Sequence, residues 1–163
     1  GNFTKTLTQY GNVWAVDISD EDLQLAGENA RLNKVEIKFL RTDLFSGLKN
    51  KKFDLIISNP PYISAGELSG LAREISFEPK QAIEAGFDGL DFYRSIISQA
   101  AVYLNNNGLL AFEVGAKQAK AVRAMLREEN FTDLKIIKDY NNIQRAVMGR
   151  KIKQDPASNY SAG

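Results

Sequence analysis

Runs of apolar, strand-like residues alternate with helix-like segments along most of this chain of 163 residues. The strand patterns fall at 12–18, 35–40, 53–58 and 109–114. The helical patterns fall at 20–33, 90–104 and 116–129, with Ser19 or Asp20 as a candidate cap for the first. Such alternation is typical of βαβ units, so we expect an α/β fold with a mostly parallel sheet. Two last strand patterns, at 134–139 and 145–151, lie too close for a helical crossover and predict a C-terminal antiparallel hairpin.

The composition limits the chemistry that the chain can perform. It contains no Cys and no His, which excludes disulfides, a Cys/His zinc site and Ser-His or Cys-His nucleophile pairs, and we expect no metal. Lys plus Arg number 21 and Asp plus Glu 20, and the net charge of +1 argues against a general polyanion binder. No apolar run is long enough to span a bilayer and no signal peptide is visible. We therefore expect a cytoplasmic protein with no membrane partner, and we do not expect nucleic acid as its direct substrate.

Three of the predicted strands end in a polar residue: Asp17, Asp43 and Asn59. In open α/β sheets, ligands bind in the crevice outside the carboxyl ends of the strands. A polar residue at one strand end is often no more than the point where the strand stops. Three in succession at the same edge of one sheet instead indicate a ligand-binding crevice.

The third of these strands ends in Asn59-Pro60-Pro61-Tyr62. The two prolines have no backbone N–H, so the strand must stop there in a rigid turn. The Asn59 side-chain oxygen and the Pro60 carbonyl remain as acceptors, and two acceptors can hold both hydrogens of a planar NH₂ group. Tyr62 supplies a flat face that can stack on that group. The stretch predicts a site for an amide or an aromatic amine, although a simple turn with a surface tyrosine is the alternative.

The same four residues resemble a known motif. Asn-Pro-Pro-Tyr after an apolar strand is similar to the motif of S-adenosylmethionine-dependent amino-group methyltransferases, which have a Rossmann-like class I fold. In that fold an acidic residue like Asp17 holds the ribose hydroxyls, and a pair like Asp43 and Leu44 lies against the adenine. The resemblance therefore implies S-adenosylmethionine as cofactor, bound by Asp17, Ile18, Asp43, Leu44 and Asn59. Similar motifs occur in enzymes acting on adenine N6, guanine N2 and glutamine N5, so the motif alone leaves the substrate open.

Two downstream segments favour one of these substrates. Residues 77–97, "FEPKQAIEAGFDGLDFYRSII", and 109–122, "LLAFEVGAKQAKAV", resemble the PrmC/HemK family of release-factor glutamine N5-methyltransferases. Enzymes of that family methylate the glutamine of the Gly-Gly-Gln loop of peptide-chain release factors. The resemblance implies a release factor as partner, with Asn59, Pro60 and Tyr62 as catalytic residues. It also implies substrate contacts by Asn59, Pro60, Pro61, Tyr62 and Glu78.

The chain departs from the family pattern at its beginning. We expect one methyltransferase catalytic domain over residues 1–153 and a flexible tail over 154–163. The first strand and the glycine-rich cofactor loop of the family are not visible, and Gly1-Asn2-Phe3-Thr4 is a candidate for the end of that loop. This chain alone is therefore expected to bind the cofactor weakly or not at all. Two other functions remain open: a nucleobase amino-group methyltransferase, and a truncated scaffold without catalysis.

The sequence also predicts one helix cap and three aromatic residues in the core. Asp88 is expected to cap the helix that follows it. Trp14, Phe39 and Phe112 fall in strand patterns, which favours packing in the core.

Overall fold

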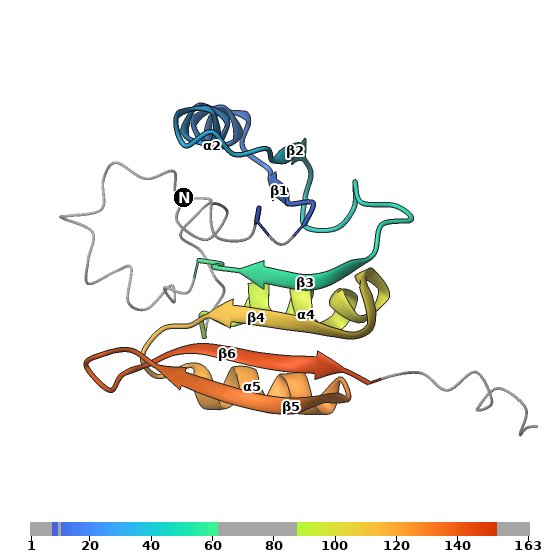
Figure 1. Cartoon of the computed structure of the whole chain (residues 1–163). Coiled ribbons are helices and arrows are strands. Elements are labelled where there is room, and N and C mark those ends of the chain that lie inside the picture. Colours follow the sequence, from blue (N-terminus) through green and yellow to red (C-terminus); the bar gives the residue numbers. More distant parts are fainter. Residues whose placement is uncertain (1–7, 10, 62–87, 153–163) are drawn as a thin grey trace, which may run out of the picture. The chain divides into compact units, whose positions relative to one another are not determined.

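The computed structural model describes residues 8–9, 11–61 and 88–152 (Figure 1). The chain divides into two compact units, Gly1–Lys51 and Lys52–Gly163, and each is described by itself. The first unit contains β1 (Trp14–Asp17), α2 (Asp20–Leu32) and β2 (Lys38–Arg41). The second contains β3 (Phe53–Ser58), α4 (Asp91–Tyr103), β4 (Leu104–Glu113), α5 (Ala119–Glu128), β5 (Phe131–Lys138) and β6 (Gln144–Lys151).

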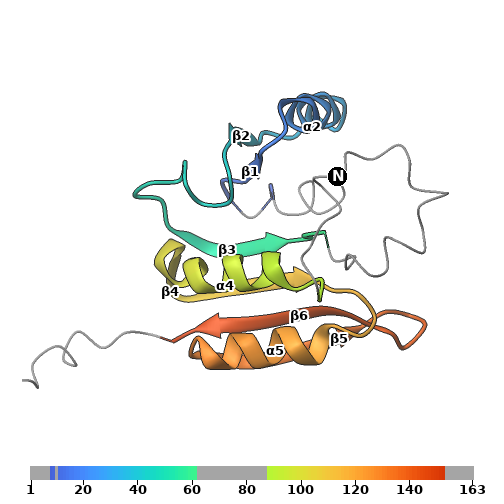
Figure 2. The same ribbon diagram turned by 180° about the vertical axis from the view of Figure 1, so that it is seen from behind.

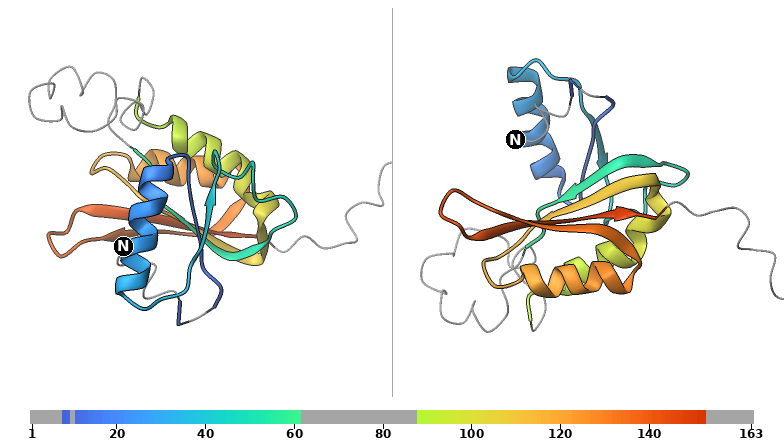
Figure 3. Two further views of the ribbon diagram at one scale, coloured as in Figure 1. Left: turned by 90° about the horizontal axis from the view of Figure 1, so that it is seen from above. Right: turned by 60° about the horizontal axis from the view of Figure 1, so that its bottom comes forward.

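The first unit is a parallel strand pair joined by a helix. β1 and β2 pair so that Asp17 lies beside Arg41, and α2 packs against both strands (Figure 3). Ser19 is the N-cap of α2, and its hydroxyl accepts a hydrogen bond from the Asp22 amide at 3.2 Å. Three acidic residues in the first turn complement the positive end of the helix dipole. The predicted helix and its Ser19 cap are confirmed.

Thr42 organises the turn that follows β2. Its side chain is buried, accepts a hydrogen bond from the Gly47 amide at 2.7 Å, and lies 2.8 Å from the Ser46 hydroxyl. A Cβ at position 47 would lie 2.9 Å from the Thr42 hydroxyl oxygen, so only glycine fits there without a shift. The turn carries Phe45 and Leu48 into buried positions.

The second unit is a four-stranded sheet with two helices on one face. The strand order is β3-β4-β6-β5, with β3 parallel to β4 and with β6 antiparallel to both of its neighbours. Figures 1 and 2 show α4 and α5 on the same face of this sheet. The predicted C-terminal hairpin is confirmed as β5 and β6, and β6 lies inside the sheet, between β4 and β5.

The core of the second unit lies between the sheet and these helices. Its fully buried side chains include Tyr93, Ile97, Leu110, Phe112, Val122, Leu126 and Val147. Tyr93 and Phe112 meet edge to face, with ring centroids 5.3 Å apart. Burying each large aliphatic side chain contributes about 1.5–3 kcal/mol.

Of the three aromatic residues predicted to lie in the core, only the one in the second unit is fully buried. Phe112 is buried as expected, whereas Trp14 and Phe39 are half-buried. The ammonium groups of Lys38 and Lys51 lie 5.6 and 5.1 Å from the centre of the Trp14 ring, within cation–π range. The prediction for Trp14 and Phe39 was therefore wrong, because β1 and β2 form a small sheet covered by one described helix.

The boundary between α4 and β4 differs from the prediction. The sequence predicted a helix over 90–104 and a strand beginning at Leu109, but β4 begins at Leu104. Phe53 pairs with Leu104 whereas Leu55 pairs with Leu109, so the intervening residues form a bulge. Side chains from other strands hold the bulge: Asp54 accepts from Asn105 at 2.7 Å, and Arg150 donates to the Asn107 carbonyl at 2.6 Å. Those contacts are long-range and have no local sequence signal.

Candidate functional site

The carboxyl ends of β1 and β2 place four of the predicted cofactor residues together. β1 ends at Asp17 with Ile18 next, and Asp43 and Leu44 follow the end of β2 at Arg41. The Thr42 amide donates to the Asp17 carbonyl at 2.9 Å, which joins the two strand ends. Because the strands are parallel, all four residues lie at one edge of this small sheet.

The Asp17 carboxylate is exposed and oriented by the backbone. Its Oδ1 accepts a hydrogen bond from the Ser19 amide at 2.9 Å. Ile18, the next residue, is 64% exposed, so a carboxylate and an apolar side chain stand side by side. Leu44 has a φ of 45°, a backbone conformation that is uncommon for a leucine and often found at functional sites. A ligand with hydroxyl groups and a flat aromatic ring, such as an adenosine, matches this set of groups.

The carboxyl end of β3 carries the predicted acceptor site. β3 ends at Ser58, followed by an exposed Asn59, a buried Pro60 and a half-buried Pro61. Burial of the first proline fixes the turn, while the amide of Asn59 remains accessible. Tyr62, Glu78, the segment 63–87, residues Gly1–Thr4 and the tail 154–163 lie outside the described residues. Their predicted roles, and the expectation that Asn59 shares one sheet edge with Asp17 and Asp43, stay predictions.

The end of β4 lies beside this turn. Ser58 pairs with Phe112, so Asn59 and Glu113 are the next residues along two neighbouring parallel strands. The fully buried Tyr93 donates its hydroxyl proton to the Glu113 carbonyl at 3.0 Å. Gln118, just before α5, hydrogen-bonds to the backbone of Gly89 and Gly115. Gln118 was not among the residues predicted for the site, although it lies in the segment 109–122 that resembles the glutamine methyltransferases, five positions after Glu113.

Asp88 has a different role from the one expected. The N-cap of α4 is Leu90, without a side-chain cap, so the prediction of Asp88 as a cap was wrong. Asp88 instead accepts from the Leu90 amide at 3.1 Å, and both of its oxygens bind Arg94, at 3.0 and 2.5 Å. The Arg94 guanidinium holds the pKa of Asp88 below its usual range, and Asp88 in turn raises the pKa of Arg94. The pair ties the residues before α4 to the first turn of that helix.

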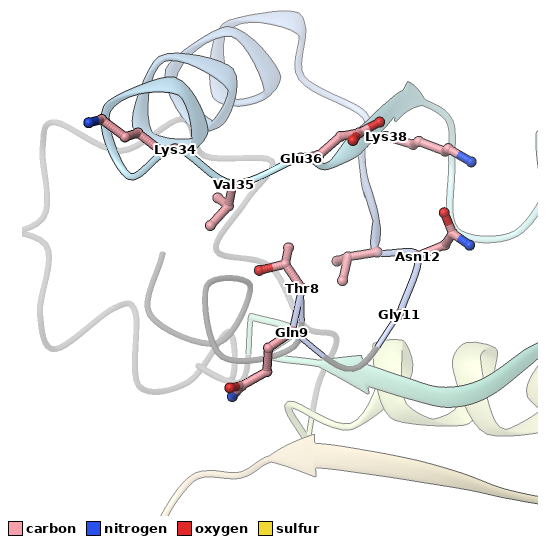
Figure 4. A pocket seen from close by; sticks show the side chains of 9 residues that line it. Thr8, Gln9, Gly11, Asn12, Lys34, Val35, Glu36 and Lys38 are labelled. Atoms are coloured by element: carbon pink, nitrogen blue, oxygen red, sulfur yellow. The ribbon is translucent and has the colours of Figure 1, made fainter.

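A separate pocket of about 340 Å³ lies at the amino ends of β1 and β2 (Figure 4). Its lining includes Asn12, Val13, Lys34, Val35, Glu36 and Lys38. These residues precede or begin the two strands, whereas Asp17 and Asp43 follow them. The pocket is therefore not part of the candidate site. Among the described residues, no helix combines the length and the apolar character that crossing a membrane requires.

Known proteins that are similar in sequence to this chain are methyltransferases. The family described as the methyltransferase small domain matches residues 3–86. A release factor glutamine methyltransferase of Fusobacterium nucleatum is 43% identical over 143 residues, which cover 86% of this chain and 40% of that protein. A ribosomal protein uL3 glutamine methyltransferase of Xanthomonas campestris is 42% identical over 121 residues, covering 74% of this chain and 39% of that protein. The resemblance to glutamine methyltransferases is thus confirmed, while the chain spans about half or less of the length of these relatives.

Solved structures confirm the fold. A methyltransferase from Pyrococcus furiosus superposes with a TM-score of 0.67 at 17% identity, covering 88% of this chain and 64% of that one. A ribosomal protein L11 methylase from Lactobacillus delbrueckii gives a TM-score of 0.62 at 24% identity, covering 94% and 65%. The predicted Rossmann-like class I architecture is therefore correct. Because the family match spans more than half of the residues, the chain belongs to the methyltransferase small domain family.

Proposed function

We propose that the protein is an S-adenosylmethionine-dependent N-methyltransferase that acts on a glutamine side-chain amide. The acceptor we assign is the glutamine of the Gly-Gly-Gln loop of a peptide-chain release factor. The observation that carries this assignment is the turn after β3. It exposes Asn59 beside a buried Pro60, in a chain 43% identical to a release factor glutamine methyltransferase over the matched region. A release factor works where translation ends, so we also place the protein in the cytoplasm.

The first unit supplies the groups suited to the cofactor. When bound, S-adenosylmethionine would supply the transferred methyl group from its sulfonium. We assign the ribose hydroxyls to the exposed Asp17 carboxylate, because carboxylates are strong hydrogen-bond acceptors. We assign the adenine to Ile18, Asp43 and Leu44, which offer apolar surface and one further carboxylate at the same strand ends.

The turn after β3 supplies the acceptor site. An amide nitrogen is a poor nucleophile because its lone pair is delocalised into the carbonyl. Hydrogen bonds from both of its N–H groups to the Asn59 side-chain oxygen and the Pro60 carbonyl would hold the nitrogen in an attacking orientation. The Asn59 and Pro60 oxygens would hold the acceptor nitrogen toward the methyl group of the sulfonium, and the surplus amide proton would leave to solvent. We assign Tyr62 to stacking on the amide, and Pro61 and Glu78 to further contacts with the substrate.

A glutamine of ribosomal protein uL3 is the second candidate acceptor. Relatives described as uL3 glutamine methyltransferases are 42% and 43% identical to this chain over the regions matched. Both substrates present a glutamine side-chain amide, so the groups at the site do not distinguish a release factor from uL3. The net charge of +1 favours either protein over bulk nucleic acid.

The test is a substrate panel with the natural protein that carries this chain. The substrates are a release factor, the same factor with its loop glutamine changed to alanine, uL3, and bulk RNA and DNA. Mass spectrometry should place one methyl group on the loop glutamine of the intact factor and none on the alanine variant. Methylation of nucleic acid alone would support a nucleobase methyltransferase, and no methylation with no cofactor binding would support a scaffold. Methyl transfer to uL3 alone would support glutamine methylation with uL3, and not a release factor, as the substrate.

A further inference from the structure

A network of two side chains joins three separate backbone segments near the end of β4. The Tyr93 hydroxyl lies 3.0 Å from the Glu113 carbonyl and 3.4 Å from Oε1 of Gln118. The same oxygen of Gln118 accepts from the Gly115 amide at 3.1 Å. The other end of that side-chain amide, Nε2, donates to the Gly89 carbonyl at 3.1 Å. One side chain therefore connects the residues before α4 to the residues after β4.

The segment held by this network is the one that adjoins the acceptor turn. Glu113 follows Phe112, the partner of Ser58, and Asn59 follows Ser58. On the other side of β4, the amide of the fully buried Val114 donates to the Arg145 carbonyl at 2.9 Å. The end of β4 is thus fixed by α4, by Gln118 and by β6. β3 and β4 share backbone hydrogen bonds as far as the Ser58–Phe112 pair, so fixing the end of β4 also restrains the end of β3.

We infer that Tyr93 and Gln118 are positioning residues for the Asn59–Pro60 acceptor site. This inference rests on the proposed function. The two acceptors must meet both hydrogens of one amide, and small displacements of such preorganised groups are costly to turnover. Tyr93 and Gln118 do not touch the substrate in this scheme. They act through the Glu113–Gly115 backbone, and the combined donor and acceptor of Gln118 suits both of its contacts.

Two conservative variants test the inference. Tyr93→Phe keeps the ring and its contact with Phe112 and removes the hydroxyl donor. Gln118→Glu keeps the length of the side chain and removes the donor to Gly89. Each should lower kcat about tenfold or more while KM and cofactor affinity change less than about threefold. The double variant should lose less than the product of the single effects, because the two side chains act as a unit.

Two control variants show whether the loss of turnover is specific to Tyr93 and Gln118 or follows from removing any similar polar group. Gln99→Glu removes an amide that donates to the Ser95 carbonyl of its own helix, and Tyr140→Phe removes a hydroxyl from a fully exposed ring. Both controls should retain wild-type kcat. If the kcat of the Tyr93 and Gln118 variants equals that of the controls, or falls only as far as their unfolded fraction requires, the positioning role is wrong.

A second readout does not depend on activity. Amide hydrogen exchange at Ser58 and Asn59 should be faster in both variants than in the wild type, while exchange in β5 and in the middle of α5 stays the same. Unchanged exchange at Ser58 and Asn59 would overturn the inference even if turnover fell. A wild-type protein that does not methylate glutamine would contradict the proposed function instead, and the exchange experiment would still decide whether Tyr93 and Gln118 hold the turn.

Discussion

The Asp17 side chain owes its orientation to the residues that begin the next helix. The backbone turns after β1 so that Ser19 can cap α2, and the Ser19 amide then donates to the Asp17 carboxylate at 2.9 Å. The carboxylate is therefore held at the strand end before any ligand arrives. A preoriented acceptor loses less side-chain entropy on binding than a free one.

Removing that carboxylate should weaken cofactor binding. A hydrogen bond to a charged group contributes about 1.5–3 kcal/mol, so Asp17→Ala in the natural protein should raise the dissociation constant for S-adenosylmethionine roughly tenfold or more. Isothermal titration calorimetry measures the change. Asp20→Ala is the matched control, because that exposed carboxylate pairs with Arg41 at the surface. Unchanged affinity in Asp17→Ala would remove the ribose assignment.

Asn59 should matter for turnover more than for cofactor affinity. Its side-chain oxygen is assigned to the acceptor amide, so Asn59→Ala should lower kcat at least ~100-fold, as loss of one preorganised hydrogen-bonding group does elsewhere. Asn59→Asp keeps an acceptor but adds a negative charge beside the positively charged methyl donor, and should also be impaired. Single-turnover kinetics and calorimetry separate the two effects. Asn106→Ala, at the exposed bulge of β4, is the control; a loss of turnover there equal to that at Asn59 would count against the assignment.

At the scale of elements, the β5–β6 hairpin depends on one carboxylate in its turn. Asp139 accepts hydrogen bonds from the Asn141 amide at 2.8 Å and the Ile143 amide at 3.0 Å, and pairs with Arg145 at 3.1 Å. The hydrogen bond from the Ile143 amide has the largest effect and lowers the pKa of Asp139 from its usual value of 3.8; burial opposes it, and Arg145 and the Asn141 amide lower the pKa further. These contacts bring β6 back toward β4, where it completes the sheet.

The Asp139 contacts predict a pH-dependent contribution to stability. A carboxyl group with a lowered pKa in the folded state binds its proton more readily when unfolded. The stabilisation is therefore complete above pH 3.8 and is lost as the pH falls through the lower, folded-state pKa. Asp139→Asn should have a lower urea midpoint than the wild type at about pH 7, with the difference shrinking by about pH 3. Asp133→Asn, at a more exposed ion pair, is the control. If the difference in urea midpoint between Asp139→Asn and the wild type grows as the pH falls, the predicted pH dependence is wrong.

At the scale of the whole molecule, the two units differ in how much core each contains. Among the described residues, the first unit buries Ala30, Phe45 and Leu48, whereas the second buries most of the apolar core, including all of the fully buried large side chains. Small units with few buried side chains open at low free energy. Amides of β1, β2 and α2 should therefore exchange with solvent at least about tenfold faster than those of β4 and β6.

Hydrogen exchange followed by mass spectrometry measures this difference directly. Peptides from α4 and α5 give the internal reference, because both helices pack on the protected sheet. Equal protection in the two units would show that they open as one cooperative body. In the natural protein, saturation with S-adenosylmethionine should slow exchange around Asp17 and Asp43, the residues assigned to the cofactor.

The sequence by itself determined the features that depend on neighbouring residues. The order of strands and helices, the cap at Ser19, the bounds of β3 and the terminal hairpin all follow from side-chain periodicity and local backbone rules. The stop after β3 follows from two prolines, which have no N–H to donate wherever they occur. Polar residues at the strand ends marked the candidate site for the same local reason.

Only the tertiary structure decided the features that join distant residues. It placed β6 between β4 and β5, and it began β4 at Leu104 because Asp54 and Arg150 hold the bulge. It also brought Tyr93 and Gln118, 25 positions apart, to the backbone beside Asn59. Propensities and periodicities report the preferences of a short segment. The free energy of these contacts depends on which distant segments pack together, so no local pattern contains them.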